Sequence, residues 1–298
     1  MNKIQPWCQA GARIAVFCPC GPPHREKTQR GLKWLRDQGY EPLLSPLLER
    51  WMAGQAAPPL PYLSGSDPER VADILWALEG VEAEVAWAVR GGYGLTRILG
   101  DLIPQTELHR PVIGFSDLTA LLARLQQLGW EAVLHGPNVQ SLALALESGE
   151  SLRSLQELLA EGRLPEFEGQ SWLPGSDCEG VAAGGNLCVL ASMCGTPQQP
   201  VWKDTILFLE DVTEHPYRLD RYLTQLHNSG AMAGVHAVVL GEFSECGEES
   251  EIRASIIETV RPWSLPVLGG LPFGHGARNQ PLPLGLRARL RGERLSFF

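Results

Sequence analysis

The chain has 298 residues, of which 44% are apolar and 20% are charged, and this composition excludes a disordered chain, a collagen-like repeat and a coiled coil. Asp and Glu (34) outnumber Lys and Arg (25), and the net charge of −9 argues against a nucleic-acid-binding protein and against an anionic membrane surface as a partner. At roughly 100–200 residues per domain, the length suggests two domains, with one large domain as the alternative.

The N-terminal residues and the cysteines bear on the cellular compartment. Residues 1–12 are polar and lack the apolar stretch of a signal peptide, and the sequence has no run of about 18 apolar residues that would predict a membrane-spanning helix. The seven cysteines include no C-x-x-C pair, and their spacing fits neither a zinc site nor a disulfide framework. We therefore expect a cytoplasmic protein whose cysteines are reduced and packed as small apolar side chains.

Strand-like and helix-like segments alternate through the first half of the chain. The predicted strands are short apolar runs at residues 13–17, 85–89, 111–115 and 131–134. The predicted helices cover residues 25–38, 69–78 and 118–128, and residues 42–48 are expected to be extended or a loop. This alternation predicts an α/β fold with a parallel sheet, helices on its faces and a ligand site at the carboxyl ends of its strands.

The composition changes near the middle of the chain. Residues 151–178 start with a predicted helix and continue with Pro, Gly and few apolar residues, so we expect a linker between a first domain (1–150) and a second (179–298). The second domain has predicted strands at 205–209 and 237–240, predicted helices at 217–226 and 251–260, and short β-like pieces after residue 267.

A serine stands where a predicted strand meets a predicted helix, in the sequence Gly114-Phe-Ser-Asp117. This order is typical of a nucleophile elbow, in which a sharp turn presents the serine hydroxyl and the next backbone N–H helps to hold an oxyanion. The strict G-x-S-x-G pattern is not met, because Leu118 occupies the second glycine position. On pattern alone, Ser116 or Asp117 could instead cap the helix.

Three glycines follow the predicted strand 85–89, in the sequence Arg90-Gly-Gly-Tyr-Gly94. Glycines allow unusual backbone angles and a close approach to a ligand. The spacing matches neither the G-x-G-x-x-G of a dinucleotide site nor the Gly-Lys-Ser/Thr of a phosphate loop, so a nucleotide phosphate is not indicated. The alternative is an ordinary loop.

An acid and a histidine could complete a serine site. The predicted strand 205–209 runs into Glu210 and Asp211, and His275 lies between two glycines. Strand alternation places Glu210 opposite the leucines of this strand, which favours it as the partner of a histidine, whereas Asp211 is expected to face apolar surroundings. Each could instead be a solvated surface residue, and His135, in a His-Gly-Pro sequence, could also line a cleft.

Together these segments resemble the LD-carboxypeptidase family of serine peptidases, which includes muramoyl-tetrapeptide carboxypeptidases and the microcin C self-immunity proteins. The matching motifs stand in the family's order: RGGYG at 90–94, GFSD at 114–117, HGP at 135–137, GGNL at 184–187, LEDV at 209–212 and GHGARNQPLPLG at 274–285. The sequence Cys18-Pro-Cys20 departs from the family's first strand-to-loop turn, where Ser or Ala is more usual.

The resemblance implies a flavodoxin-like or Rossmann-like parallel-sheet domain carrying Ser116 and a smaller β-rich C-terminal domain supplying Glu210 and His275, with the active site between them. It implies a cytoplasmic homodimer without metal or cofactor, and removal of the terminal D-Ala from a muropeptide tetrapeptide. In the expected mechanism Ser116 is the nucleophile, His275 the general base and acid, and Glu210 the group that orients the imidazole.

Neighbouring groups are expected to hold the substrate. The oxyanion would be bound by the backbone N–H groups of Asp117 and of Gly92 or Gly91. The candidate substrate-binding residues are Arg90, Gly91, Tyr93 and Arg278, and either arginine could bind the terminal carboxylate.

Three other functions are compatible with these residues. Hydrolysis of a peptidyl or aminoacyl nucleotide would keep the triad and change the pocket, and Trp172 and Trp202 are candidates for a surface that stacks on a base. A catalytically silent module that senses muropeptides is disfavoured because all three triad residues are present. A flavodoxin-like protein that binds a flavin or nucleotide is disfavoured because no phosphate loop is present.

Overall fold

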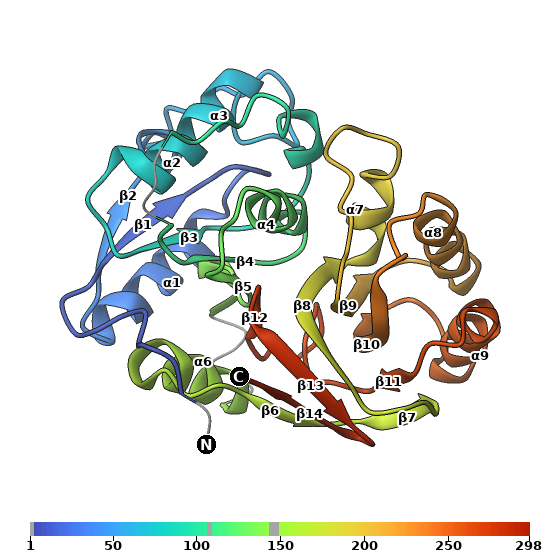
Figure 1. Ribbon diagram of the computed structural model, residues 1–298. Coiled ribbons are helices and arrows are strands. Elements are labelled where there is room, and N and C mark those ends of the chain that lie inside the picture. Colours follow the sequence, from blue (N-terminus) through green and yellow to red (C-terminus); the bar gives the residue numbers. More distant parts are fainter. Residues whose placement is uncertain (1–2, 106–108, 143–148) are drawn as a thin grey trace.

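The first of two sheets matches the predicted α/β class. The computed structural model describes residues 3–105, 109–142 and 149–298, and its first sheet has six strands in the order β12-β5-β4-β3-β1-β2 (Figure 1). Five of them are mutually parallel: β1 (Arg13–Phe17), β2 (Glu41–Leu44), β3 (Val85–Ala88), β4 (Val112–Gly114) and β5 (Val133–His135). The order 2-1-3-4-5 is that of flavodoxin-like folds, so this expectation is confirmed.

The second sheet has eight strands in the order β6-β14-β13-β8-β9-β10-β11-β7. Its middle strands are parallel: β8 (Cys178–Asn186), β9 (Thr205–Val212), β10 (Val235–Ser244) and β11 (Val267–Gly269). The flanking strands pair antiparallel: β6 (Glu166–Glu168), β7 (Gln170–Leu173), β13 (Arg287–Arg291) and β14 (Arg294–Phe297). The expected second, β-rich part is present, but its sheet is the larger of the two in the described residues.

Helices cover both sheets. They are α1 (Arg25–Asp37), α2 (Pro46–Met52), α3 (Asp67–Leu75), α4 (Leu118–Gln127), α6 (Glu150–Glu161), α7 (Leu187–Ser192), α8 (Pro216–Asn228) and α9 (Glu249–Val260). Helix α4 of the first half packs against α7 and β8 of the second (Figure 1). Among the described residues, no helix is both long and apolar enough to cross a lipid bilayer.

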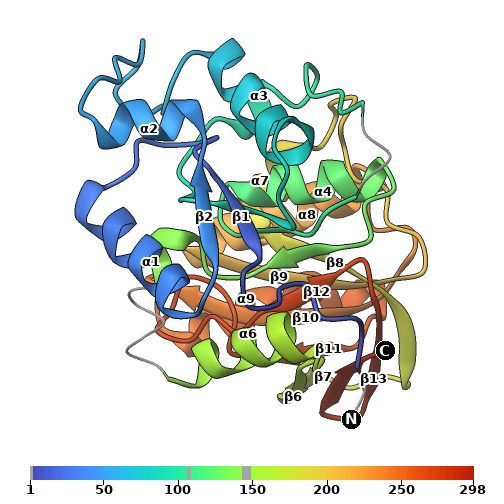
Figure 2. The ribbon, with the colours of Figure 1, turned by 90° about the vertical axis from the view of Figure 1, so that its left-hand side faces the viewer.

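The segment expected as a linker and the end of the chain both take part in the sheets. Residues 151–178 contain most of α6 together with β6 and β7, which lie at opposite edges of the second sheet. Figure 2 looks onto the β2 edge and shows α2 and α3 at one end of the molecule and α6, β6 and β7 at the other. Strand β12 (Leu282–Leu284) returns from the second half to pair antiparallel with β5. The division at residues 150 and 179 stays a prediction.

All seven cysteines lie in the described part of the chain, and none forms a disulfide. Cys18 and Cys20 are fully buried. Burial raises the pKa of both thiols, so they are uncharged at neutral pH. Both lie within the loop that follows β1, where Sγ of Cys18 donates to the carbonyl oxygen of Gly21 at 3.7 Å and the thiol of Cys20 bonds to Asp117.

Candidate active site

Ser116 stands at a sharp turn between β4 and α4. Its backbone φ is 68°, a left-handed value that is uncommon for residues other than glycine. Asp117 is the N-cap of α4, but its side chain makes no capping hydrogen bond. Its carboxylate instead accepts a hydrogen bond from the backbone N–H of Leu95 at 3.1 Å. Helix capping by Ser116 or Asp117 is therefore the wrong interpretation, and the strained strand–turn–helix geometry of a nucleophile elbow is present.

Glu210 and His275 form a hydrogen-bonded pair in the second half of the chain. Glu210 is the sixth residue of β9 and is fully buried, and its Oε2 lies 2.6 Å from Nδ1 of His275. Gly274 has a φ of 120°, and a Cβ there would lie 3.0 Å from both Cβ and Oε2 of Glu210. Only glycine allows the loop to bring the imidazole this close to the carboxylate.

The pKa of His275 is raised from its ordinary value. Burial alone lowers it, but the hydrogen bond that His275 donates to Glu210 and the negative charges of Glu210 and Asp211 together outweigh that effect. The imidazolium that forms when a base accepts a proton is therefore stabilised. This is the electrostatic arrangement that a general base in a serine hydrolase requires.

The two halves of the chain meet at Phe115. Its ring centroid lies 4.8 Å from that of His275, and Ser116 is the next residue along the chain. Among the described residues, Ser116 Oγ makes no hydrogen bond with His275. Hydrogen bonds between catalytic groups are often long before substrate binds, so this geometry is compatible with a nucleophile and its base.

Asp211 has a different role from Glu210. Its carboxylate accepts hydrogen bonds of 2.9 Å from Nδ2 of Asn186 and from the backbone N–H groups of Cys188 and Val212. The expectation that Asp211 faces apolar surroundings is wrong, because it lies at the N-terminus of α7, where unpaired N–H groups need an acceptor. Burial raises its pKa to about 7 despite these donors.

The glycine loop at 90–94 lies directly against the nucleophile turn. A Cβ on Gly91 would lie 2.7 Å from Cβ and 3.0 Å from Oγ of Ser116, so the backbone can approach only because this residue is glycine. Gly92 has a φ of 126°, and a Cβ there would lie 3.1 Å from both Cα and N of Gly21. Both glycines thus hold the loop where a backbone donor for an oxyanion would be needed.

The three side chains predicted to bind substrate each have a different environment in the structure. Arg90 donates a hydrogen bond from Nη1 to the carbonyl of Pro22 at 2.7 Å, so part of its guanidinium is used within the protein. Arg278 is half exposed and pairs with Glu242 at 3.3 Å. Tyr93 is 48% exposed, and its ring meets that of Tyr62 edge-on, with the ring centroids 5.8 Å apart.

His135 packs between two phenylalanine rings behind the site. His135 is fully buried rather than lining a cleft, because its ring lies between those of Phe115 and Phe273, each at 5.9 Å. Burial lowers its pKa to about 4, which keeps it neutral. No signal in the sequence distinguishes this apolar packing from a role at a surface.

Comparisons with known proteins identify the family. A model of the LD-carboxypeptidase N-terminal domain matches residues 14–136, and a model of the C-terminal domain matches residues 179–290. The chain belongs to the LD-carboxypeptidase family. Ser116 lies in the part that matches the N-terminal domain, and Glu210 and His275 lie in the part that matches the C-terminal domain.

Relatives of this LD-carboxypeptidase family member extend over nearly its whole length. The murein tetrapeptide carboxypeptidase of Pseudomonas aeruginosa is 32% identical over 320 residues, covering 99% of this chain and 98% of that protein. The crystal structure of muramoyltetrapeptide carboxypeptidase from Oxalobacter formigenes superposes with a TM-score of 0.79 at 30% identity, covering 96% and 97% of the two chains. The MccF-like protein from Streptococcus pneumoniae in complex with AMP has the same fold, with a TM-score of 0.83, 17% identity and coverage of 97% and 99%.

Proposed function

We propose that this protein is a serine carboxypeptidase that removes the terminal D-Ala from murein tetrapeptides. The observation that carries the proposal is the pair of Glu210 and His275, 2.6 Å apart, packed through Phe115 against the strained turn that presents Ser116. The proposal is supported by the similarity over nearly full length to proteins described as murein or muramoyl tetrapeptide carboxypeptidases.

Each residue has a defined step in this reaction. Ser116 Oγ attacks the carbonyl carbon of the diaminopimelate residue, and its proton passes to His275. His275 then donates that proton to the amine of D-Ala as the C–N bond breaks. A water molecule, deprotonated by His275, hydrolyses the tripeptidyl ester and regenerates Ser116. Glu210 stabilises the imidazolium in both steps, and backbone N–H groups of Asp117 and the glycine loop bind the oxyanion.

A comparison of substrates tests the proposed reaction. Purified protein is incubated with a tetrapeptide that ends in diaminopimelate–D-Ala and, as the matched control, with its diastereomer that ends in L-Ala. Mass spectrometry should show the loss of one alanine from the first peptide and no loss from the second. Cleavage of neither peptide would contradict the proposed function, and equal cleavage of both would contradict the assigned specificity.

The alternative substrate is a peptidyl or aminoacyl nucleotide. The similarity to the AMP-bound MccF-like protein, at 17% identity, concerns the fold. The two tryptophans that could stack on a base, Trp172 and Trp202, are only 9% and 6% exposed. They therefore offer no face for a nucleobase, and the tetrapeptide is favoured. An aminoacyl sulfamoyl adenosine, added to the same assay, should be left intact while D-Ala is released from the tetrapeptide.

A further inference from the structure

An arginine is completely buried beside the candidate active site. Arg70, on α3, is 0% exposed. Its Nη1 donates to the carbonyl oxygens of Pro19, at 2.9 Å, and Gly94, at 3.0 Å, and its Nη2 pairs with Asp67 at 2.7 Å. A buried guanidinium is costly unless it is paired and hydrogen-bonded, so this position needs an explanation beyond filling the core.

The partners of Arg70 lie on the two loops that surround the nucleophile turn. Pro19 belongs to the loop after β1, and Gly94 ends the glycine loop after β3. Gly94 must be glycine here, because its φ is 115° and a Cβ would lie 2.9 Å from Nη1 of Arg70. One guanidinium nitrogen therefore links the ends of the first and third strands of the parallel sheet, where the ligand site of this fold lies.

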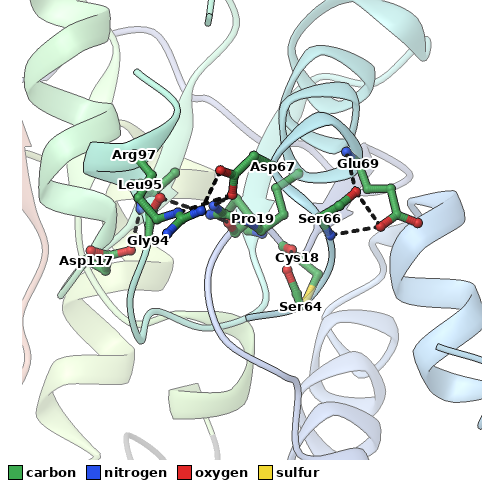
Figure 3. A network of polar contacts seen from close by, with 11 residues as sticks. Cys18, Pro19, Ser64, Ser66, Asp67, Glu69, Gly94, Leu95, Arg97 and Asp117 are labelled. Carbon is green, nitrogen blue, oxygen red and sulfur yellow. Dashed lines mark hydrogen bonds and ion pairs between the residues drawn. The ribbon is translucent and has the colours of Figure 1, made fainter. Parts of the chain in front are cut away.

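The same loop is held from its other side by the nucleophile turn. The backbone N–H of Leu95, next to Gly94, donates to Oδ2 of Asp117 at 3.1 Å. Asp117 directly follows Ser116. Figure 3 shows Asp117 and Leu95 in contact, with Gly94 beside them and with Pro19 and Asp67 beyond. The glycine loop is thus fastened at Gly94 by α3 and at Leu95 by the nucleophile turn.

A second ion pair braces this arrangement. Oδ2 of Asp67 accepts a hydrogen bond of 2.8 Å from Nη2 of Arg97, on the segment that follows the glycine loop. Asp67 therefore joins the buried Arg70 to the exposed Arg97. With two arginines and two carboxylates, the network neutralises its own charges while it fixes the loop at residues 90–94.

We propose that the side chains of Arg70 and Asp117 are positioning residues that hold the glycine loop against Ser116, so that its N–H groups already point at the site where an oxyanion forms. This inference rests on the proposed function, since it takes Ser116 as the nucleophile. Neither side chain touches a reacting atom. Donors fixed before the reaction stabilise developing charge without the cost of reorganisation, and the loss of one such donor lowers the rate by about 10²–10³-fold.

The test uses a reagent that reports on the oxyanion site independently of the natural substrate. A fluorophosphonate forms a bond between phosphorus and Ser116 Oγ, fluoride leaves as the P–F bond breaks, and the hydroxyl proton passes to His275. The labelling rate of the full-length protein is measured by intact mass for the parent, Arg70→Met and Arg70→Lys. The matched control is Arg50→Met, which breaks an exposed ion pair between Arg50 of α2 and Glu69 of α3, the helix that carries Arg70.

The expected rates follow from the contacts. Arg70→Met should label about 10²-fold more slowly than the parent, because all three contacts are lost. Arg70→Lys keeps the charge and can reach one carbonyl, so its labelling rate should lie between those of the parent and Arg70→Met. It serves as the deciding variant if Arg70→Met does not fold. Arg50→Met should label like the parent. On the tetrapeptide, kcat should fall in the two Arg70 variants while KM and the midpoint of the pH profile stay constant.

Two results would overturn the inference, and they are distinguishable. Folded Arg70 variants that label as fast as the parent would show that Arg70 does not position the oxyanion site, and would leave the proposed function intact. A parent protein that is not labelled at Ser116 and does not cleave the tetrapeptide would contradict the proposed function, and the inference would fail with it.

Discussion

At the scale of single residues, the carboxylate partner of the histidine is the most informative assignment. Alternation along the strand 205–209 favours Glu210 over Asp211, and the structure places Glu210 within 2.6 Å of His275. The same alternation predicts apolar surroundings for Asp211 and fails, because β9 ends beside the N-terminus of α7. Sequence periodicity shows on which face of a strand a side chain lies, but it does not show which helix or strand packs against that face.

The pH profile tests the role of Glu210. The neutral imidazole of His275 is the base, so kcat/KM should rise with pH through the pKa of His275, which lies above its ordinary value. Glu210→Gln removes the charge that stabilises the imidazolium, so the pKa falls and the acid limb moves to lower pH. The plateau rate should fall by about 10⁴-fold, as for other triads that lose this carboxylate. An unchanged midpoint in the variant would argue that Glu210 does not act on His275.

Replacement of Asp211 should lower the stability of the protein, whereas replacement of Glu210 should lower its activity. Asp211→Ala leaves three N–H donors without their acceptor at a buried site, which costs about 1–3 kcal/mol of unfolding free energy. Urea unfolding should therefore show a lower midpoint, whereas Glu210 and His275 keep their pairing. A variant with full stability and no activity would instead assign catalysis to Asp211.

At the scale of elements, most segments of the parallel sheet are predictable from apolar runs and turn residues. The predicted strand 13–17 coincides with β1, and the predicted helix 118–128 differs from α4 by one residue at its end. The prediction that residues 42–48 are extended or a loop is confirmed at β2 (41–44) but is wrong from Pro46, where α2 begins. Helix α2 is only seven residues long, and its start depends on Ser45, whose hydroxyl accepts from Leu48 N–H.

Strand β8 shows a second limit of sequence patterns. Apart from Val181, its sequence has alanines and glycines in place of the β-branched residues typical of strands. The reason is the packing: a Cβ on Gly184 would lie 1.9 Å from the carbonyl oxygen of Phe208 on the neighbouring strand, and a Cβ on Gly185 would lie 2.5 Å from Oγ1 of Thr119 on α4. Gly184 is therefore required by the pairing with β9, and Gly185 by the contact between the two halves of the chain.

The glycine loop provides a test at this scale. In Gly91→Ala the new methyl group would lie within 3.0 Å of Cβ and Oγ of Ser116, so either the loop or the nucleophile turn must shift. A displacement of about 1 Å in an active site can lower kcat by about 10²-fold, and we expect a loss of that order with little change in folding. Gly100→Ala is the control, because its Cβ would lie 3.6 Å from Nε2 of Gln198. Equal activity of both variants would contradict the assigned loop position.

At the scale of the whole molecule, the two halves of the chain are joined by a shared strand and by a hydrogen bond between elements of the two halves. Strand β12 comes from the second half and pairs with β5 of the first sheet. The backbone N–H of Asn186, at the end of β8, donates to Oγ1 of Thr119 at 2.9 Å. A division of the sequence into domains, drawn from composition alone, does not reveal these contacts between the two halves, because pairings between distant strands leave no local pattern in the sequence.

Because of these contacts between the two halves, we predict that the chain unfolds in one step. The first sheet takes its edge strand β12 from the second half, and α4 of the first half packs against α7 and β8 of the second. Hydrogen exchange followed by mass spectrometry in increasing urea should therefore show β1–β5 and β8–β11 losing protection at the same urea concentration. Two separate midpoints, with one sheet persisting after the other has opened, would show instead that the halves are energetically independent.

The most direct measurement for the whole account is the release of D-Ala from the tetrapeptide by three proteins: the parent, Ser116→Ala and Ser192→Ala. Ser192 is an exposed serine of α7 whose hydroxyl donates to the carbonyl of Val189 in the same helix, so Ser192→Ala controls for the loss of a serine hydroxyl elsewhere. We predict equal rates for the parent and Ser192→Ala and a rate at least about 10³-fold lower for folded Ser116→Ala. Release of D-Ala by Ser116→Ala at the rate of the parent would contradict the assignment of the nucleophile and, with it, the proposed triad.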